Sequence, residues 1–201
     1  MKITHRQAVE LLRALDEFHF IPRAGLDLAA TISANAQRAR IEAERRFSLS
    51  LTSDEPGVRV LGELLSAVHV AMRPHRLARM FGAKISFPSS VLMANTFGAF
   101  LGEALRHRVG GEWRLVDHGN QTLVALCSDP GNWSLPTYKA GKHFQNGEED
   151  NVWLFYSVMV QKLGGSPVKP ILTISTDDLK DPAEYARKWA EMFKNARPAA
   201  K

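Results

Sequence analysis

The spacing of apolar residues changes at the glycine pair Gly110–Gly111, and this change limits the possible folds more than any other feature. Before the pair, apolar residues recur every three to four positions, which is the period of an amphipathic helix. After it, residues 113–115 and 123–127 alternate between apolar and less apolar types on either side of the turn DHGNQ, which predicts a β-hairpin. The sequence therefore predicts an α+β fold, in which a helical bundle-like N-terminal half packs with a small antiparallel sheet and two C-terminal helices.

Two helices are expected in the first 50 residues. Thr4 and Gln7 have the spacing of a capping box, so a first helix should begin there and run to about Phe18. Residues 25–46 are rich in Ala, Arg and Glu and carry a stripe of small apolar residues, which predicts a second helix.

A third and a fourth helix are expected before the glycine pair. Asp54 is a good N-cap and Pro56 suits the first helical turn, so the third helix should open there and be broken or kinked at Pro74. The segment FPSS, residues 87–90, supplies a new N-cap for a helix over residues 91–109.

The pattern after the hairpin is less regular. Residues 132–144 are expected to form an irregular strand or a loop, because they contain a proline and a glycine that discourage regular strand pairing. A helix is expected over residues 147–163, a strand over residues 170–176 and a last helix from Asp181. One domain over residues 1–201 is expected, with a helical part (1–88) and an α+β part (89–201) as the alternative.

Charge and cysteine content limit the compartment and the partners. The formal net charge is +5, and the excess lies in residues 1–110, which hold 15 Lys/Arg against 10 Asp/Glu. An anionic partner is therefore plausible, although solvated helix faces often carry arginine. The single cysteine, Cys127, cannot form an internal disulfide, and the N-terminus does not resemble a signal peptide. We therefore expect a cytoplasmic protein without a membrane span.

Catalytic and metal-binding signatures are missing. None of the seven histidines has the spacing of a zinc site; His69 and His75, for example, are six residues apart with a proline between them. A serine elbow, a phosphate-binding glycine loop and a dinucleotide fingerprint are also missing. His143, Glu148 and Asp150 could form an acid/base group, but acids at a helix start are better explained by the helix dipole. We expect no enzyme activity, no cofactor and no metal.

Two arginine-rich segments provide the main alternative. Arg38, Arg40, Arg45 and Arg46 form one cluster, and Arg73, Arg76 and Arg79 form another. Such clusters can contact phosphates, so a nucleic-acid-associated regulator is a second hypothesis. The clusters lack interleaved aromatic residues that would stack on bases, and solvated helix faces explain them equally well.

The segment 97–159 resembles a pattern in uncharacterised small bacterial α+β proteins, some of which resemble toxin-immunity proteins. The residues that carry the resemblance are Gly98, Gly102, Glu103, Gly110, Gly111, Trp113, Asn146, Gly147, Glu149 and Asp150. It covers about a third of the chain and provides no catalytic residues to transfer. It implies a cytosolic protein that neutralises a cognate toxin or secretion-system effector by occluding its active site. An unrecognised type of enzyme is the third hypothesis.

A binding protein of this kind needs a stable scaffold with a charged surface that is complementary to its partner. The acids near residue 150 could face a basic toxin cleft, whereas the N-terminal arginines could face an acidic one. The residues expected to bind the partner are Glu148, Glu149, Asp150, Lys139, Lys142, Arg76 and Arg79.

Overall fold

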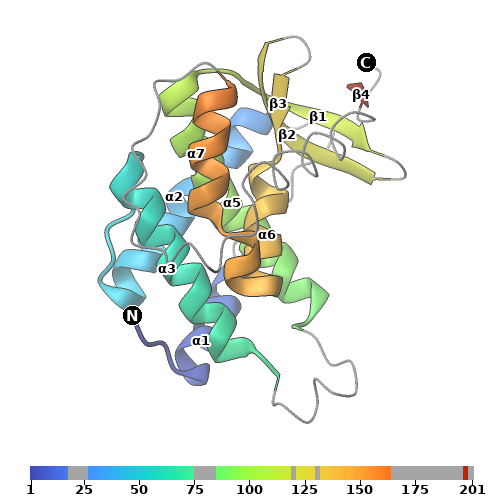
Figure 1. The fold of residues 1–201 in the computed structure, drawn as a ribbon. Helices are drawn as coiled ribbons and strands as arrows, with labels where there is room; N and C mark the ends of the chain where they lie inside the picture. The colour runs from blue at the N-terminus through green and yellow to red at the C-terminus, as the bar shows by residue number, and fades with distance from the viewer. Residues whose placement is uncertain (18–26, 75–84, 119–120, 130–131, 164–196, 199–201) are drawn as a thin grey trace.

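A computed structural model describes residues 1–17, 27–74, 85–118, 121–129, 132–163 and 197–198 (Figure 1). Helices dominate up to Val109 and strands follow, as the change of apolar period predicts. In chain order the elements are α1 (His5–Glu17), α2 (Leu28–Phe47), α3 (Glu55–Met72), α5 (Phe87–Val109), β1 (Glu112–His118), β2 (Gln121–Asp129), β3 (Asn132–Ser134), α6 (Pro136–Asn146), the 3-10 helix η1 (Gly147–Asp150), α7 (Val152–Lys162) and β4 (Arg197–Pro198).

The predicted starts of the first and third helices are confirmed by their caps, whereas α2 begins at Leu28, after its N-cap Asp27, and not at residue 25. The Thr4 amide donates to Gln7 Oε1 at 2.9 Å and the Gln7 amide donates to Thr4 Oγ1 at 3.3 Å, which is the reciprocal pattern of a capping box. The Asp54 carboxylate accepts from the Gly57 amide and caps α3. Helix α3 ends at Met72, just before Pro74.

Helix α5 lies at the centre of the fold and contacts α1, α2, α3, α6 and α7 (Figure 1). It begins at Phe87 rather than at the predicted residue 91, because the Ser86 side chain caps it and a proline occupies its first turn. Its Phe97 and Phe100 side chains are fully buried, so α5 supplies the centre of the hydrophobic core. It ends at Val109 as predicted, where Gly110 adopts a positive φ of 76°.

The β-hairpin is confirmed. Strands β1 and β2 pair antiparallel from the Glu112–Cys127 pair to the His118–Gln121 pair, across the predicted turn. The short strand β3 pairs with β2 and the two-residue β4 pairs with β1, which gives the order β3-β2-β1-β4. The α+β class is therefore confirmed.

The prediction of a strand or loop over residues 132–144 is wrong from Pro136 onward, where α6 begins. Pro136 occupies the first turn of α6, where its missing N–H costs no hydrogen bond. A Cβ at Gly141 would lie 3.1 Å from the Ala94 Cβ, so this glycine lets α6 approach α5 closely. Both residues that were expected to disrupt a strand thus support a helix.

The helix predicted over residues 147–163 is also wrong at its start. Residues 147–150 form η1, and α7 begins only at Val152, where Asn151 Oδ1 accepts from the Trp153 and Leu154 amides. The three acids therefore precede the α-helix and do not form its first turn. The strand expected over residues 170–176 and the helix expected from Asp181 lie outside the described residues.

Alanine substitutions at two helix-interior glycines, Gly98 and Gly62, should change the stability of the protein in opposite directions. A Cβ at Gly98 would lie 2.4 Å from Thr137 Cα on α6, so Gly98→Ala should lower the free energy of unfolding by about 1–3 kcal/mol. A Cβ at Gly62 would lie 3.6 Å from Val152 Cγ2, an ordinary contact, so Gly62→Ala should raise it by up to about 1 kcal/mol. Urea unfolding of the two variants measures both changes, and a Gly98→Ala protein as stable as wild type would contradict the α5–α6 packing.

Candidate functional site

The residues expected to bind a partner have different environments. Glu148 and Glu149 are exposed on η1, Asp150 is partly buried, and Lys142 on α6 is partly buried with its ammonium 5.5 Å from the centre of the Tyr138 ring. Arg76 and Arg79 lie outside the described residues.

Lys139 was expected to bind a partner, but its side chain is fully buried and does not reach the surface. Its Nζ lies 2.8 Å from Asp150 Oδ1, and Asn146 Nδ2 donates to the other oxygen of Asp150 at 2.6 Å. Burial lowers the pKa of Lys139, although the ion pair opposes that shift. Burial alone would raise the pKa of Asp150, but the bonds from Lys139 and Asn146 outweigh it and hold this pKa below its ordinary value. The pair therefore joins α6 to η1.

A second set of contacts joins η1 to α3 through a buried imidazole. His143 Nδ1 accepts from the Val152 amide at 3.2 Å, and Nε2 lies 2.8 Å from Ser66 Oγ. Ser66 in turn donates to Glu148 Oε1, and Asn151 Nδ2 donates to Glu148 Oε2 at 2.5 Å. Burial lowers the pKa of His143 to about 4, so the ring is neutral at pH 7.

The direction of these hydrogen bonds decides what the cluster can do. Because His143 Nδ1 accepts from a backbone amide, the single proton of the neutral ring must be on Nε2, which then donates to Ser66. A histidine that activates a serine needs the opposite arrangement, with a bare nitrogen facing the hydroxyl. The Glu148 carboxylate is 4.0 Å from His143 Nε2, too far for a direct hydrogen bond, and Ser66 bridges the two. This geometry favours a structural role for Ser66.

The sequence offered His143, Glu148 and Asp150 as a possible acid/base group, and the structure places the three residues near one another. Ser66 was not predicted as a member, since it is 77 residues from His143 and has no distinguishing neighbours in the sequence. His69, whose Nδ1 donates to the Phe144 carbonyl at 2.8 Å, was not predicted either. The cluster therefore forms only when α3, α6 and η1 pack together.

Ser66→Ala tests the structural role of the cluster. A fluorophosphonate probe, which reacts with activated serines, should not label the wild-type protein, because His143 cannot accept the proton from Ser66. The substitution should lower the free energy of unfolding by about 1–2 kcal/mol, since it leaves the His143 donor without this partner. Labelling that disappears in the Ser66→Ala protein would contradict this interpretation.

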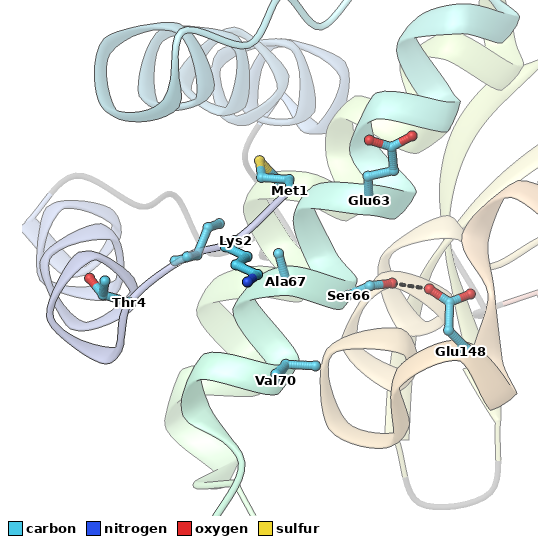
Figure 2. Close-up of a pocket in the computed structure, with 9 residues that line it drawn as sticks. Met1, Lys2, Thr4, Glu63, Ser66, Ala67, Val70 and Glu148 are labelled. Carbon is cyan, nitrogen blue, oxygen red and sulfur yellow. Dashed lines mark hydrogen bonds between the residues drawn. The ribbon is translucent and has the colours of Figure 1, made fainter.

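An open groove borders the cluster at Ser66 and Glu148 (Figure 2). Its volume is about 640 Å³, and its lining residues are Met1, Lys2, Ile3, Thr4, Glu63, Ser66, Ala67, Val70 and Glu148. Among the described residues only three large hydrophobic side chains are exposed, and two of them, Met1 (51%) and Val70 (68%), line this groove. In this groove, exposed apolar side chains and carboxylates therefore lie together.

Three arginines of α2, Arg38, Arg40 and Arg46, contact residues within the chain, whereas Arg45 is exposed. Arg38 Nη2 lies 3.1 Å from Glu42 Oε1, without hydrogen-bond geometry at that oxygen, and Arg46 Nε donates to Glu42 Oε2 at 2.6 Å. Arg40 donates to the Leu51 carbonyl, and its guanidinium lies 5.3 Å from the centre of the Phe100 ring. Glu42 is fully buried, so Arg38 and Arg46 supply the counter-charge that its carboxylate needs inside the protein.

Two further ionisable side chains, those of Glu103 and Cys127, lie in environments that favour a structural role. Glu103 accepts from Arg106 and from Trp113 Nε1 at 2.7 Å, which joins α5 to β1. Cys127 is half-buried, and burial raises the pKa of its thiol, which disfavours the reactive thiolate at neutral pH. Within the described ranges, no group of three or more His, Cys, Asp or Glu residues is arranged to hold a metal ion.

Comparison of the chain with protein-family models, curated protein sequences and solved structures gave no match. The described part of the chain contains no helix with both the length and the apolar character that a membrane span requires.

Proposed function

We propose that this is a non-enzymatic binding protein that neutralises a bacterial toxin or secretion-system effector by covering its active site. The observation that carries the proposal is the groove, where exposed Val70 and Met1 lie beside the carboxylates of Glu63 and Glu148. Protein interfaces combine apolar anchors with a polar rim in this way. Cytoplasmic location, where such a protein would protect its own cell, is part of the same proposal.

The polar cluster behind the groove supports binding rather than chemistry. Glu148 is held by Ser66 and Asn151, and the adjacent Asp150 is held by Lys139 and Asn146, so η1 is fixed before any partner arrives. A surface that is already ordered loses less conformational entropy on association, which strengthens binding. Rigid carboxylates at a groove edge therefore suit recognition of a protein.

Several residues that carry the resemblance to immunity proteins have packing roles in this structure. Gly98 and Gly102 allow close contact with α6 and with the Trp113 ring, and Gly147, at φ 70°, lies against the His69 ring. Glu103 and Asp150 form the internal bonds described above. Because packing explains these residues, the function rests on the groove.

Capture of a partner tests the proposal. The tagged full-length chain, purified from its native host, should recover one protein in a stoichiometric complex, and co-expression should protect cells from that protein or from the product of a neighbouring gene. Recovery of no stoichiometric protein, together with no protection, would contradict the proposal. A gel shift with duplex DNA and with RNA provides the control for the nucleic-acid hypothesis, since phosphate contacts weaken as salt rises.

A further inference from the structure

Helix α7 begins with a hydrogen bond that comes from another helix. The first amides of an α-helix have no acceptor within that helix, so other groups must supply one. Asn151 Oδ1 accepts from the Trp153 and Leu154 amides. The Val152 amide instead donates to His143 Nδ1 of α6, at 3.2 Å. His143 therefore completes the N-terminal cap of α7 from outside the helix.

This cap works only while the imidazole is neutral. A backbone amide can only donate, so His143 Nδ1 must offer a lone pair to Val152. An imidazolium carries a proton on both nitrogens, and its Nδ1 proton would face the amide proton. The positive end of the helix dipole also repels a cation at this place. Both residues are fully buried, so water cannot replace the lost bond while the turn stays closed.

The other ring nitrogen tolerates protonation. His143 Nε2 lies 2.8 Å from Ser66 Oγ and already donates to it in the neutral ring. Ser66 donates in turn to Glu148, whose carboxylate is 4.0 Å from Nε2 and attracts a proton to the ring. The contact of α6 with α3 is therefore compatible with both charge states, whereas the contact of α6 with α7 is compatible with one.

The remaining surroundings of the ring keep it neutral at pH 7. The charged and titratable groups that act on it are Lys139 on α6, His69 on α3, and Glu148 and Asp150 on η1. Residues 87–102 of α5, which pack against α6, and residues 152–154 of α7 add no titratable side chain. Lys139 and Asp150 pair with each other at 2.8 Å. Burial outweighs the attraction of the two acids and lowers the pKa of His143 to about 4.

We propose that His143 is a pH-sensitive cap of α7, which holds the first turn of this helix closed when the ring is neutral and releases it when the ring is protonated. That turn carries Trp153, whose ring centre lies 3.8 Å from the Arg59 guanidinium of α3. Its release separates the start of α7 from α6 and α3, while Ser66 keeps η1 attached to α3. The device goes beyond the proposed binding function and does not depend on it.

Amide hydrogen exchange of the full chain, followed by NMR at pH 7 and pH 5, tests the device. Protection of the amides of residues 152–154, relative to the intrinsic exchange rate at each pH, should fall by about tenfold or more at pH 5, because the open turn binds the proton more readily. The fall should be the same in urea well below the unfolding transition, since a local opening exposes little surface. Amides of buried Phe97 and Phe100 in α5 should instead exchange faster as urea is added.

Two variants separate the cap from the other contact of the ring. His143→Asn places an amide oxygen near the position of Nδ1 without a titratable group, so residues 152–154 should stay protected at pH 7 and lose their pH response. Ser66→Ala leaves the bond from the Val152 amide in place, so the pH response should remain. Circular dichroism verifies that both variants fold.

Three results would overturn the device. They are equal protection of residues 152–154 at pH 7 and pH 5 in the wild-type protein, a fall in protection that grows with urea as global unfolding does, and a pH response that survives in His143→Asn. If His143→Asn does not fold, the wild-type protein and Ser66→Ala decide, and a pH response that Ser66→Ala abolishes would contradict a conflict at Nδ1.

Discussion

Alanine in place of Asp150 should lower the free energy of unfolding by about 3–5 kcal/mol, which is the largest effect that we expect of a single substitution. The Lys139 side chain is fully buried, and its Nζ lies 2.8 Å from Asp150 Oδ1. Removing the carboxylate leaves an ammonium in a low-dielectric interior without this counter-charge, and burial already lowers the pKa of Lys139. Urea unfolding at pH 7 measures the loss.

Lys139→Met is the matched control. The Asp150 side chain is 21% exposed and keeps the bond from Asn146, so the carboxylate remains partly solvated when the ammonium is removed. This variant should lose only about 1–2 kcal/mol, and the double variant Lys139→Met/Asp150→Ala should be more stable than Asp150→Ala alone. An Asp150→Ala protein within about 1 kcal/mol of wild type would show that the pair does not hold η1.

Mild acid should destabilise the protein through His143. The pKa of this histidine is about 4 in the folded protein, compared with 6.5 when it is exposed, because burial disfavours the imidazolium. Since the unfolded chain binds the proton more readily, the stabilising contribution is complete above pH 6.5 and is lost as pH falls toward 4. The total loss is about 3 kcal/mol, of which about 2 kcal/mol falls between pH 7 and pH 5.

Urea unfolding at pH 7 and pH 5 measures this loss, and His143→Gln is its control. The carboxylates with lowered pKa, such as Asp150 and Glu103, start from ordinary values of 3.8 and 4.5, so they contribute little above pH 5. The glutamine variant should be less stable than wild type at pH 7, but it should change by less than about 1 kcal/mol between the two pH values. Equal stability of the wild-type protein at pH 7 and pH 5 would contradict the inference that His143 is buried and neutral.

Local signals predicted the starts of α1 and α3 because each start depends on residues a few positions apart. Thr4 with Gln7 forms a capping box wherever the chain continues as a helix, and Asp54 caps α3 through the amide three residues on. The hairpin follows from the same kind of local alternation. The error over residues 132–144 arose because Pro136 and Gly141 were judged as strand breakers. Gly141 instead allows α6 to pack closely against Ala94 of α5, a contact between residues far apart in the sequence.

The site could be predicted only in part, because its contacts join distant segments. Glu148, Glu149 and Asp150 stand out as an acidic run, but nothing near Lys139 marks it as the buried partner of one of them. Ser66 is 82 residues from the carboxylate that it contacts. The residues of α3 that line the groove were not singled out from the sequence either, because their exposure depends on what packs against the helix.

Binding without catalysis can be tested by titrating the toxic activity of the captured partner with this protein. Inhibition should be complete at one equivalent and should not increase with incubation time, because a binding protein acts by stoichiometry. Complete neutralisation by a small fraction of an equivalent, increasing with time, would show turnover and contradict the proposed function.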